Sequence, residues 1–260
     1  MSARPIRVLV TGASGFVGGA LLARLTADPA FSAIGIGRRP LPELAGYRVV
    51  DLAAPDAEAR LSTLRPDPAR PDSALFVPDV VVHAAARSSP WGTRAEFERE
   101  NVGITRTLLR WAESLPRAPR VVHLSTASVL YRARDQRGLR GDLPAREPFV
   151  SEYARSKAAA EELVRAYPGE WVVLRPRAVF GPGDSTVFPR LLAAARSGRL
   201  PRLRVPRAGP VLSDLVHIDT LVEAIVRCVT DAAPVGRTVA VVGGDPVDLQ
   251  QTVFGILTRL

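Results

Sequence analysis

A chain of 260 residues is long enough for one large domain or two small ones, and its 47% hydrophobic and 23% charged residues exclude disorder as the default state. No apolar run reaches the ~18 residues of a membrane-spanning helix, and no secretory hydrophobic region follows the N-terminus. The single cysteine, Cys228, is expected to be an inert core thiol, and three scattered histidines do not suggest a metal site. We therefore expect a cytoplasmic protein with no membrane segment and no bound metal.

The charge of the chain raises the question of a nucleic-acid partner, because the net charge is +9. This charge is spread along the sequence, aromatic residues make up only 6%, and no zinc-finger or RNA-binding pattern is present, so we expect none. Of the 35 basic residues only Lys157 is a lysine. A chain that otherwise uses arginine and keeps one lysine indicates a position that needs a compact ammonium group.

Short apolar runs alternate with helical patterns along the chain, which predicts βαβ units and a parallel sheet. The predicted strands cover residues 6–11, 33–37, 47–52, 77–86, 120–129, 171–180 and 238–242. The predicted helices cover residues 95–114, 151–167, 187–197, 220–230 and 247–260, besides one that ends near residue 27 and one inside the connection 55–73. This order predicts a doubly wound α/β fold of the Rossmann type. Residues 1–175 would form a dinucleotide-binding domain, and residues 176–260 would complete the sheet and contribute the substrate-binding part.

A glycine-rich turn, T-G-A-S-G-F-V-G at residues 11–18, joins the first predicted strand to the first predicted helix. The first glycine permits a tight turn, the second lets a pyrophosphate approach the backbone, and the third allows close packing of strand and helix. The free N–H groups at the start of the helix suit phosphate oxygens. The residues expected to bind a dinucleotide here are Gly12, Ser14, Gly15, Phe16, Val17 and Gly18.

Two arginines, Arg38 and Arg39, follow the second predicted strand, where an acidic side chain would favour NAD. A guanidinium at this place can grip a ribose 2′-phosphate through charge-assisted hydrogen bonds. We therefore expect NADP as the cofactor, with Arg38 as the main contact and NAD as the alternative. At the end of the third strand, Asp51 and Leu52 are expected to contact the adenine.

A candidate catalytic group begins with Tyr153 and Lys157, which share one face of a predicted helix because they are four residues apart. An ammonium beside a phenol favours the phenolate, so we expect Lys157 to lower the pKa of Tyr153 and to bond the cofactor ribose. The end of the fifth strand supplies a hydroxyl to hold a substrate carbonyl, with Thr126 as first choice and Ser125 as second. Asn101 is interpreted as structural.

Further motifs occur in the order of a known family. They are H-A-A-A at 83–86, N-V-G at 101–103, S-T-A-S at 125–128, L-R-P at 174–176, G-P-G-D at 181–184 and L-V-H-I-D at 215–219. With the glycine turn and the tyrosine–lysine pair, the chain resembles an extended short-chain dehydrogenase/reductase of the NAD-dependent epimerase/dehydratase superfamily. W-G at 91–92 and F-P-R-L-L at 188–192 resemble its 3β-hydroxysteroid dehydrogenase-like branch.

The resemblance implies hydride transfer between a nicotinamide and a ketone–alcohol pair on a small hydrophobic or acyl substrate. Tyr153 would donate or accept the proton, and Thr126 would orient the carbonyl. Lys157 would lower the pKa of Tyr153 and bind the ribose. The loop after the fourth strand would pass beneath the cofactor, and the proline after the sixth would lie near the nicotinamide. These further cofactor contacts are Ala84, Ala85, Ala86 and Pro176.

Departures from the family pattern narrow the activity. Ala127 and Ser128 stand where dehydratases carry an Asp-Glu pair, so we do not expect elimination. Ala178 replaces an asparagine of many nucleotide-sugar enzymes, which weakens the hypothesis that the protein is a sugar epimerase. A nicotinamide-dependent epimerase remains the first alternative to an oxidoreductase, and a non-catalytic NADP-sensing module remains the second.

The C-terminal part differs from the family in length. Relatives usually continue beyond the last strand into a substrate lid, whereas this chain stops at Leu260, so we expect a small, truncated substrate-binding part. The arginine-rich loop 131–147 is expected beside the substrate cleft, where it would steer an anionic substrate or form solvated surface. Family members commonly pair through helices that flank the sheet, so the resemblance also suggests a homodimer.

Overall fold

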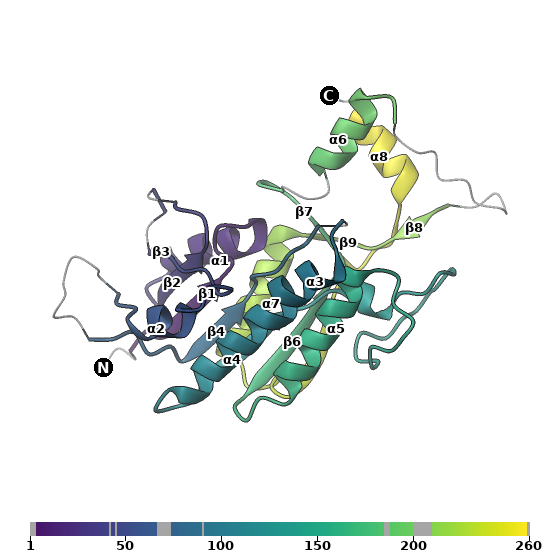
Figure 1. Ribbon diagram of the computed structural model, residues 1–260. Coiled ribbons are helices and arrows are strands. Elements are labelled where there is room, and N and C mark those ends of the chain that lie inside the picture. Colours follow the sequence, from purple (N-terminus) through teal and green to yellow (C-terminus); the bar gives the residue numbers. More distant parts are fainter. Residues whose placement is uncertain are drawn as a thin grey trace.

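The central element of the computed structural model is a seven-stranded parallel sheet (Figure 1). The structure describes residues 4–41, 43–44, 46–66, 74–89, 91–184, 188–199 and 210–258. From edge to edge the strands are β10 (Arg237–Val241), β6 (Trp171–Pro176), β5 (Arg120–Leu124), β4 (Val80–His83), β1 (Ile6–Thr11), β2 (Phe31–Gly37) and β3 (Tyr47–Val49). The strand order reverses between β1 and β4. This arrangement confirms the predicted doubly wound fold and places its switch point at the carboxyl ends of these two strands.

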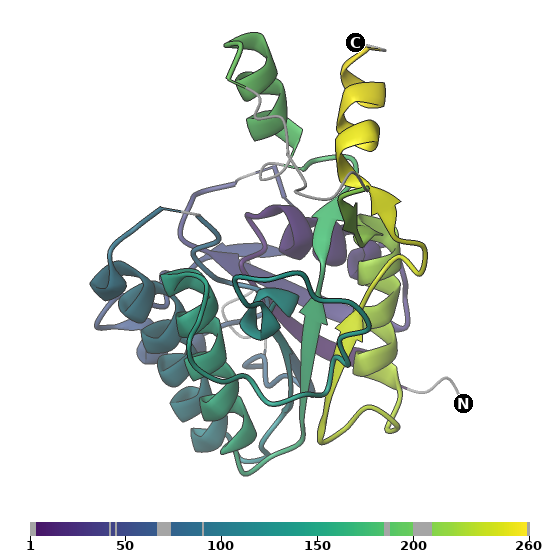
Figure 2. The same ribbon diagram turned by 90° about the vertical axis from the view of Figure 1, so that its right-hand side faces the viewer.

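Helices cover both faces of the sheet (Figure 2). One face carries α1 (Phe16–Thr26) and α7 (Ile218–Thr230), and the other carries α2 (Ala57–Ser62), α4 (Ile104–Ser114) and α5 (Glu152–Arg165). Successive strand residues alternate between these layers, so Val8 and Val10 pack with α1 and α7 while Leu9 packs with the opposite layer. Burial on both faces explains why the strands are almost continuous apolar runs in the sequence.

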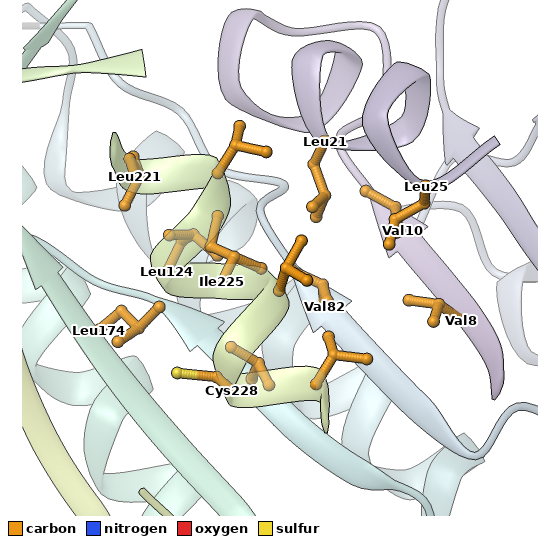
Figure 3. Close-up of a cluster of buried hydrophobic side chains, with 14 of the residues drawn as sticks. Val8, Val10, Leu21, Leu25, Val82, Leu124, Leu174, Leu221, Ile225 and Cys228 are labelled. Carbon is orange, nitrogen blue, oxygen red and sulfur yellow. The ribbon is translucent and has the colours of Figure 1, made fainter. Parts of the chain in front are cut away.

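Figure 3 shows the apolar layer between the sheet and helices α1 and α7. Leu21 and Leu25 from α1 and Leu221 and Ile225 from α7 are completely buried there. Cys228 lies in the same layer, and burial raises the pKa of its thiol to about 11. Its place in this layer confirms the prediction that Cys228 is a core residue.

Several predicted strands end earlier in the structure, and the reasons are local. Strand β4 stops before Ala85 because the backbone N–H of that residue donates to Thr11 Oγ1 at 3.1 Å. The predicted strand 120–129 stops at Leu124, and a 3₁₀-helix (Ala127–Leu130) follows it. The predicted strand 171–180 divides into β6 and β7 (Ala178–Phe180), and β7 pairs with β9 (Leu215–His217) in a separate small sheet.

The predicted helix 95–114 is also divided. It consists of α3 (Arg94–Phe97), a π-helical segment (Glu98–Gly103) and α4. The start of α3 is fixed by a capping box between Thr93 and Glu96, in which each side chain bonds the other residue's backbone N–H. A π-helical turn inside a helix frequently marks a functional site, and this one lies directly after the loop that follows β4.

Some of the segments after β6 form a smaller group of elements beyond the carboxyl end of the sheet, while α7 and β10 belong to its central layers (Figures 1 and 2). Helices α6 (Phe188–Arg196) and α8 (Leu249–Leu257) project there, next to the antiparallel pair β8 (Leu212–Ser213) and β11 (Val247–Asp248). The predicted helix 247–260 begins only at Leu249, because the carboxylate of Asp248 accepts the N–H groups of the first helical turn. Position 187 of one predicted helix, positions 259–260 of another and positions 67–73 of the predicted connection lie outside the described residues.

None of the helices in the described ranges has both the length and the apolar composition that crossing a bilayer requires.

Candidate functional site

A cleft of about 820 Å³ opens at the carboxyl ends of the central strands. It occupies the switch point of the sheet, where open α/β folds bind their ligands. Every residue that the sequence assigned to catalysis or cofactor binding lines this one cleft. These residues are Gly12, Ser14, Gly15, Phe16, Val17, Gly18, Arg38, Asp51, Leu52, Ala84, Ala85, Ala86, Thr126, Tyr153, Lys157 and Pro176.

The glycine turn is packed too closely for side chains. Gly12 has a φ of +68°, and a Cβ added there would lie 2.7 Å from the backbone N and Cα of Ala85. A Cβ on Gly18 would lie 2.3 Å from the carbonyl oxygen of Gly12. Gly15 is the N-cap of α1 and supplies no capping side chain, so the first N–H groups of the helix face the cleft without a side-chain acceptor. This cradle fits a pyrophosphate group.

The two arginines after β2 have different partners. Arg39 donates to the carbonyl oxygen of Ser14 and so braces the glycine turn. Arg38 remains 64% exposed and pairs with Glu100 at 3.1 Å across the cleft. Glu100 also pairs with Arg87 at 3.3 Å and with Arg99 at 3.1 Å. The sequence analysis missed this carboxylate, although its position beside Asn101, in the segment that follows β4, was a signal for it.

Asp51 and Leu52 lie in the cleft beyond the end of β3, as the sequence predicted. The carboxylate of Asp51 accepts the backbone N–H of Ala53 at 2.9 Å, which holds the turn there. The carboxylate can accept further hydrogen bonds, including one from a ligand.

The hydroxyls of Thr126 and Ser125 have different hydrogen-bond partners. The hydroxyl of Ser125 is buried and donates to the carboxylate of Glu161 at 2.5 Å. The hydroxyl of Thr126 caps the following 3₁₀-helix, accepts the backbone N–H of Ser128 at 3.2 Å, and lies 3.1 Å from the hydroxyl of Ser128. Because the hydroxyl of Ser125 is bonded to Glu161, the one of Thr126 is the one that acts on the pKa of Tyr153.

The protonation of Tyr153 differs from the expectation. Burial raises the pKa of Tyr153 to about 12, and only the hydroxyl of Thr126 acts in the opposite direction. The prediction that Lys157 lowers this pKa is wrong for the chain as the structure describes it. The ammonium itself is buried, and burial lowers the pKa of Lys157 to about 8, with the charge of Glu161 opposing the shift. Both groups line the cleft, and at neutral pH the phenol holds its proton.

Lys157 lies against a pair of histidines that the sequence analysis did not connect. Its Nζ lies 3.3 Å from Nε2 of His123, which is completely buried. The register of β4 and β5 places His83 directly beside His123, with ring centroids 5.3 Å apart. Burial holds the pKa of both histidines below the usual range, to about 3 for His83, so both rings are neutral.

The hydrogen bonds of His83 fix its tautomer. The hydroxyl of Thr105 donates to the carbonyl oxygen of Asn101 at 2.6 Å, so it must accept the Nε2–H of His83 at 2.9 Å. Nδ1 of His83 then accepts the hydroxyl hydrogen of Thr11 at 2.8 Å, while Thr11 accepts the N–H of Ala85. This chain of bonds holds the loop after β4 against the end of β1.

Asn101 is structural, as interpreted from the sequence. Its Oδ1 accepts the backbone N–H of Arg87 at 2.7 Å, and its Nδ2 donates to the hydroxyl of Ser156 at 2.8 Å. The side chain is 2% exposed and joins the loop after β4 to helix α5.

A buried ion pair supports the site from below. Glu161 and Arg175 are both completely buried and form two hydrogen bonds, of 2.9 Å and 2.6 Å. Arg165 also bonds Glu161, at 2.7 Å. Burial raises the pKa of Glu161, but the bonds from Arg175, Ser125 and Arg165 outweigh it and hold that pKa below its usual value. The sequence analysis missed this pair, although Glu161 lies four residues after Lys157 on the same helix face.

The arginine-rich loop 131–147 contributes only Tyr131 to the cleft. Two of its arginines bond within the loop, since Arg132 donates to the carbonyl of Arg146 and Arg140 pairs with Asp142 at 2.6 Å. Arg175 anchors the loop through the carbonyl oxygens of Gly141 and Leu143.

Comparison with known proteins identifies the class. The model of the NAD dependent epimerase/dehydratase family matches residues 8–243, and the chain belongs to this family. It is an enzyme family with the Rossmann-like fold that the sheet shows.

Relatives in the family include two named ketone reductases. The chain is 31% identical to a 2-alkyl-3-oxoalkanoate reductase of Stenotrophomonas maltophilia, over 98% of this chain and 76% of that protein. It is 34% identical to the 4-hydroxy-2-methyl-3-oxo-4-farnesyl-3,4-dihydroquinoline-1-oxide ketoreductase of Stigmatella aurantiaca, over 94% of this chain and 70% of that protein. It is 30% identical to the protein YbjS of Escherichia coli over 70% of this chain, a match that spans 55% of YbjS.

Solved structures share the fold. The UDP-glucuronic acid 4-epimerase of Bacillus cereus, in complex with UDP-glucuronic acid and NAD, matches with a TM-score of 0.75 and 22% identity, over 98% of this chain and 84% of that one. RMD from Pseudomonas aeruginosa, complexed with NADPH, matches with a TM-score of 0.71 and 23% identity, over 97% of this chain and 84% of that one.

Proposed function

We propose that this protein is an NADP-dependent oxidoreductase that interconverts a ketone and a secondary alcohol on a small hydrophobic or acyl substrate. The observation that carries the proposal is that Thr126, Tyr153 and Lys157 line the same cleft as the glycine turn. Two hydroxyls that face one cleft can bond one carbonyl oxygen together. The two ketone reductases among the relatives support this reading.

The cofactor proposal depends on residues at two ends of the cleft. The glycine turn and the start of α1 would hold the pyrophosphate, and Lys157 would bond the nicotinamide ribose. Arg38, whose side chain is 64% exposed, would hold a ribose 2′-phosphate, and the residues of β2 include no carboxylate that would repel it. When bound, the nicotinamide supplies or accepts a hydride.

The chain's own residues handle the proton. Because its pKa is raised to about 12, Tyr153 carries its proton at neutral pH and can donate it to the oxygen of a ketone that is being reduced. In the reverse direction the phenolate takes the hydroxyl proton of the alcohol. Thr126 bonds the same oxygen and fixes the carbonyl relative to Tyr153.

The test is NADPH oxidation with a panel of ketones and 3-oxoacyl thioesters, for the wild type and for Tyr153→Phe. Removing a general acid should reduce turnover by about 10²- to 10⁴-fold, while NADPH binding, followed by fluorescence, stays unchanged. Full turnover by Tyr153→Phe would refute the mechanism. A cofactor that stays bound without net change in absorbance, while a substrate stereocentre inverts, would identify an epimerase instead.

A further inference from the structure

Arg177 is a cleft residue that neither the cofactor nor the proton transfer uses. It follows Pro176 directly at the end of β6, and the register pairs Leu174 of this strand with Leu124 of β5. The residues just beyond these two strand ends are therefore neighbours, among them Thr126. The guanidinium of Arg177 lies 4.8 Å from the ring centre of Tyr131, which follows the 3₁₀-helix that Thr126 caps.

The guanidinium has more donors than partners. One nitrogen, Nη2, donates to the hydroxyl of Ser213 at 3.0 Å, and the Tyr131 ring covers one face. Nε is buried and has no partner in the described part of the chain. The charge of Asp214 acts on Arg177 from a distance, but within the described ranges no carboxylate forms an ion pair with it. A guanidinium offers five N–H donors, and in the described part of the chain only one of the four on its two terminal nitrogens has a partner, so these nitrogens can bind a ligand.

The charges that line the cleft are unevenly distributed. Its carboxylates are Asp51 and Glu100, and Glu100 is already paired with Arg38 and Arg87. Beside Arg177 lies the ring of Tyr131, and the small apolar side chains of Ala178 and Val179 follow it in the chain and line the cleft, as does Arg190 of α6. A half-buried cation beside apolar groups favours a ligand that brings one negative charge and an apolar body.

We propose that Arg177 binds a carboxylate of the substrate while Thr126 and Tyr153 hold its ketone or alcohol oxygen. This inference rests on the proposed function and adds the substrate class, an oxo or hydroxy acid with an apolar chain. A planar carboxylate matches the fork of one guanidinium and balances its single charge, whereas a phosphate dianion would leave a negative charge uncompensated there.

The turnover experiment compares 3-hydroxyoctanoate with its methyl ester, both oxidised with NADP⁺, in the wild type, Arg177→Gln and Arg134→Gln. Arg134 is an exposed arginine of the loop 131–147, so its replacement makes the same change in net charge outside the cleft. We expect Arg177→Gln to lower kcat/KM for the acid by about tenfold to a hundredfold and to leave the ester within about twofold. Arg134→Gln should change neither.

Equal losses for acid and ester in Arg177→Gln, or no preference of the wild type for the acid, would overturn the proposal. Thermal unfolding and NADPH binding show whether Arg177→Gln folds. If it does not fold, Arg177→Lys serves, because it keeps the charge and loses the fork, and it should lower kcat/KM for the acid only.

A binding experiment separates this proposal from the function itself. Octanoate, 1-octanol and octyl phosphate are titrated calorimetrically into the NADP⁺-loaded protein and into Arg177→Gln. We expect octanoate to bind at least about tenfold more tightly than octanol, and Arg177→Gln to abolish the difference. If neither hydroxy compound turns over but this difference is found, the proposed function fails and the carboxylate site stands. Equal binding of octanoate and octanol, or tighter binding of octyl phosphate, would exclude the carboxylate site.

Discussion

The Nζ of Lys157 lies 3.3 Å from Nε2 of His123, in the interior of the protein beneath the cleft. When Lys157 is an ammonium it donates to Nε2, and the hydrogen of His123 must then lie on Nδ1. Nδ1 is buried and has no partner among the described residues. The imidazole therefore serves as a hydrogen-bond acceptor for the lysine at the expense of an unsatisfied N–H, which costs about 1–3 kcal/mol.

Replacing His123 should change how the enzyme depends on pH. Because burial already lowers the pKa of Lys157 to about 8, activity that needs the ammonium declines as the pH rises through that value. In His123→Phe the ammonium loses its acceptor, so its pKa falls further and the alkaline limb of kcat/KM moves to lower pH. His123→Gln keeps an acceptor and should restore the limb. Two opposing effects act on the thermal stability of His123→Phe, because the buried unpaired nitrogen is removed while the buried ammonium loses its acceptor. An alkaline limb at the same pH in all three proteins would contradict this role.

The fold could be predicted from the sequence because its signals are local. Alternating apolar runs and helical patterns gave the order of strands and helices, and the glycine turn fixed the first crossover. The ends of elements were less predictable, since they depend on tertiary bonds. Strand β4 ends where Ala85 turns to Thr11, and the helix after it includes a π-helical segment around Asn101.

The candidate site, too, could be predicted from the sequence only where its signals are local. Tyr153 and Lys157 share a helix face, and Thr126 follows the end of β5, so their presence in one cleft follows from local geometry and topology. The contact between His123 and Lys157 could not be predicted from the sequence, because it depends on how β5 packs against α5. Glu161 had a signal in its spacing from Lys157, but its partner Arg175 comes from a strand fourteen residues further along the chain.

Arg38 should control the choice between the two nicotinamide cofactors. In Arg38→Gln the charge that would hold a 2′-phosphate is lost, so KM for NADPH should rise by about tenfold or more, while KM for NADH changes little. Arg60→Gln, an exposed arginine of α2 that pairs with Asp56, is the matched control for net charge. Steady-state kinetics with both cofactors measures the ratio. An equal rise in KM for NADPH and for NADH would show that Arg38 stabilises the cleft but does not bind the 2′-phosphate.

The glycine turn should tolerate no side chain at Gly18. A Cβ there would lie 2.3 Å from the carbonyl oxygen of Gly12, so Gly18→Ala must move the turn away from α1. We expect a loss of about 1–3 kcal/mol in unfolding free energy and weaker NADPH binding. Gly255→Ala in α8 is the control, because a Cβ there meets nothing within 4 Å. Helix propensity predicts that this control gains up to about 1 kcal/mol. Equal NADPH affinity of Gly18→Ala and wild type would refute the close-packing role of the turn.

The buried ion pair of Glu161 and Arg175 should contribute to the stability of the fold. Removing one partner leaves the other charge buried, so Glu161→Leu and Arg175→Met should each cost about 3–5 kcal/mol of unfolding free energy at pH 7. The double variant removes both charges together and should cost less than either single change, although the loop carbonyls of Gly141 and Leu143 lose their donor.

The pH dependence of these costs distinguishes an ion pair from mere packing. The pKa of Glu161 is held below its usual value in the folded protein, so its contribution is fully present above the unfolded pKa of about 4.3 and is lost as the pH falls through the lower folded value. The cost of Glu161→Leu, measured by denaturant unfolding, should therefore be constant above about pH 5 and shrink below pH 4.3. The double variant should show less loss of stability than the wild type over the same acidic range. A cost of Glu161→Leu that is the same at pH 7 and at pH 3 would mean that the carboxylate stabilises the fold by its volume, not by its charge.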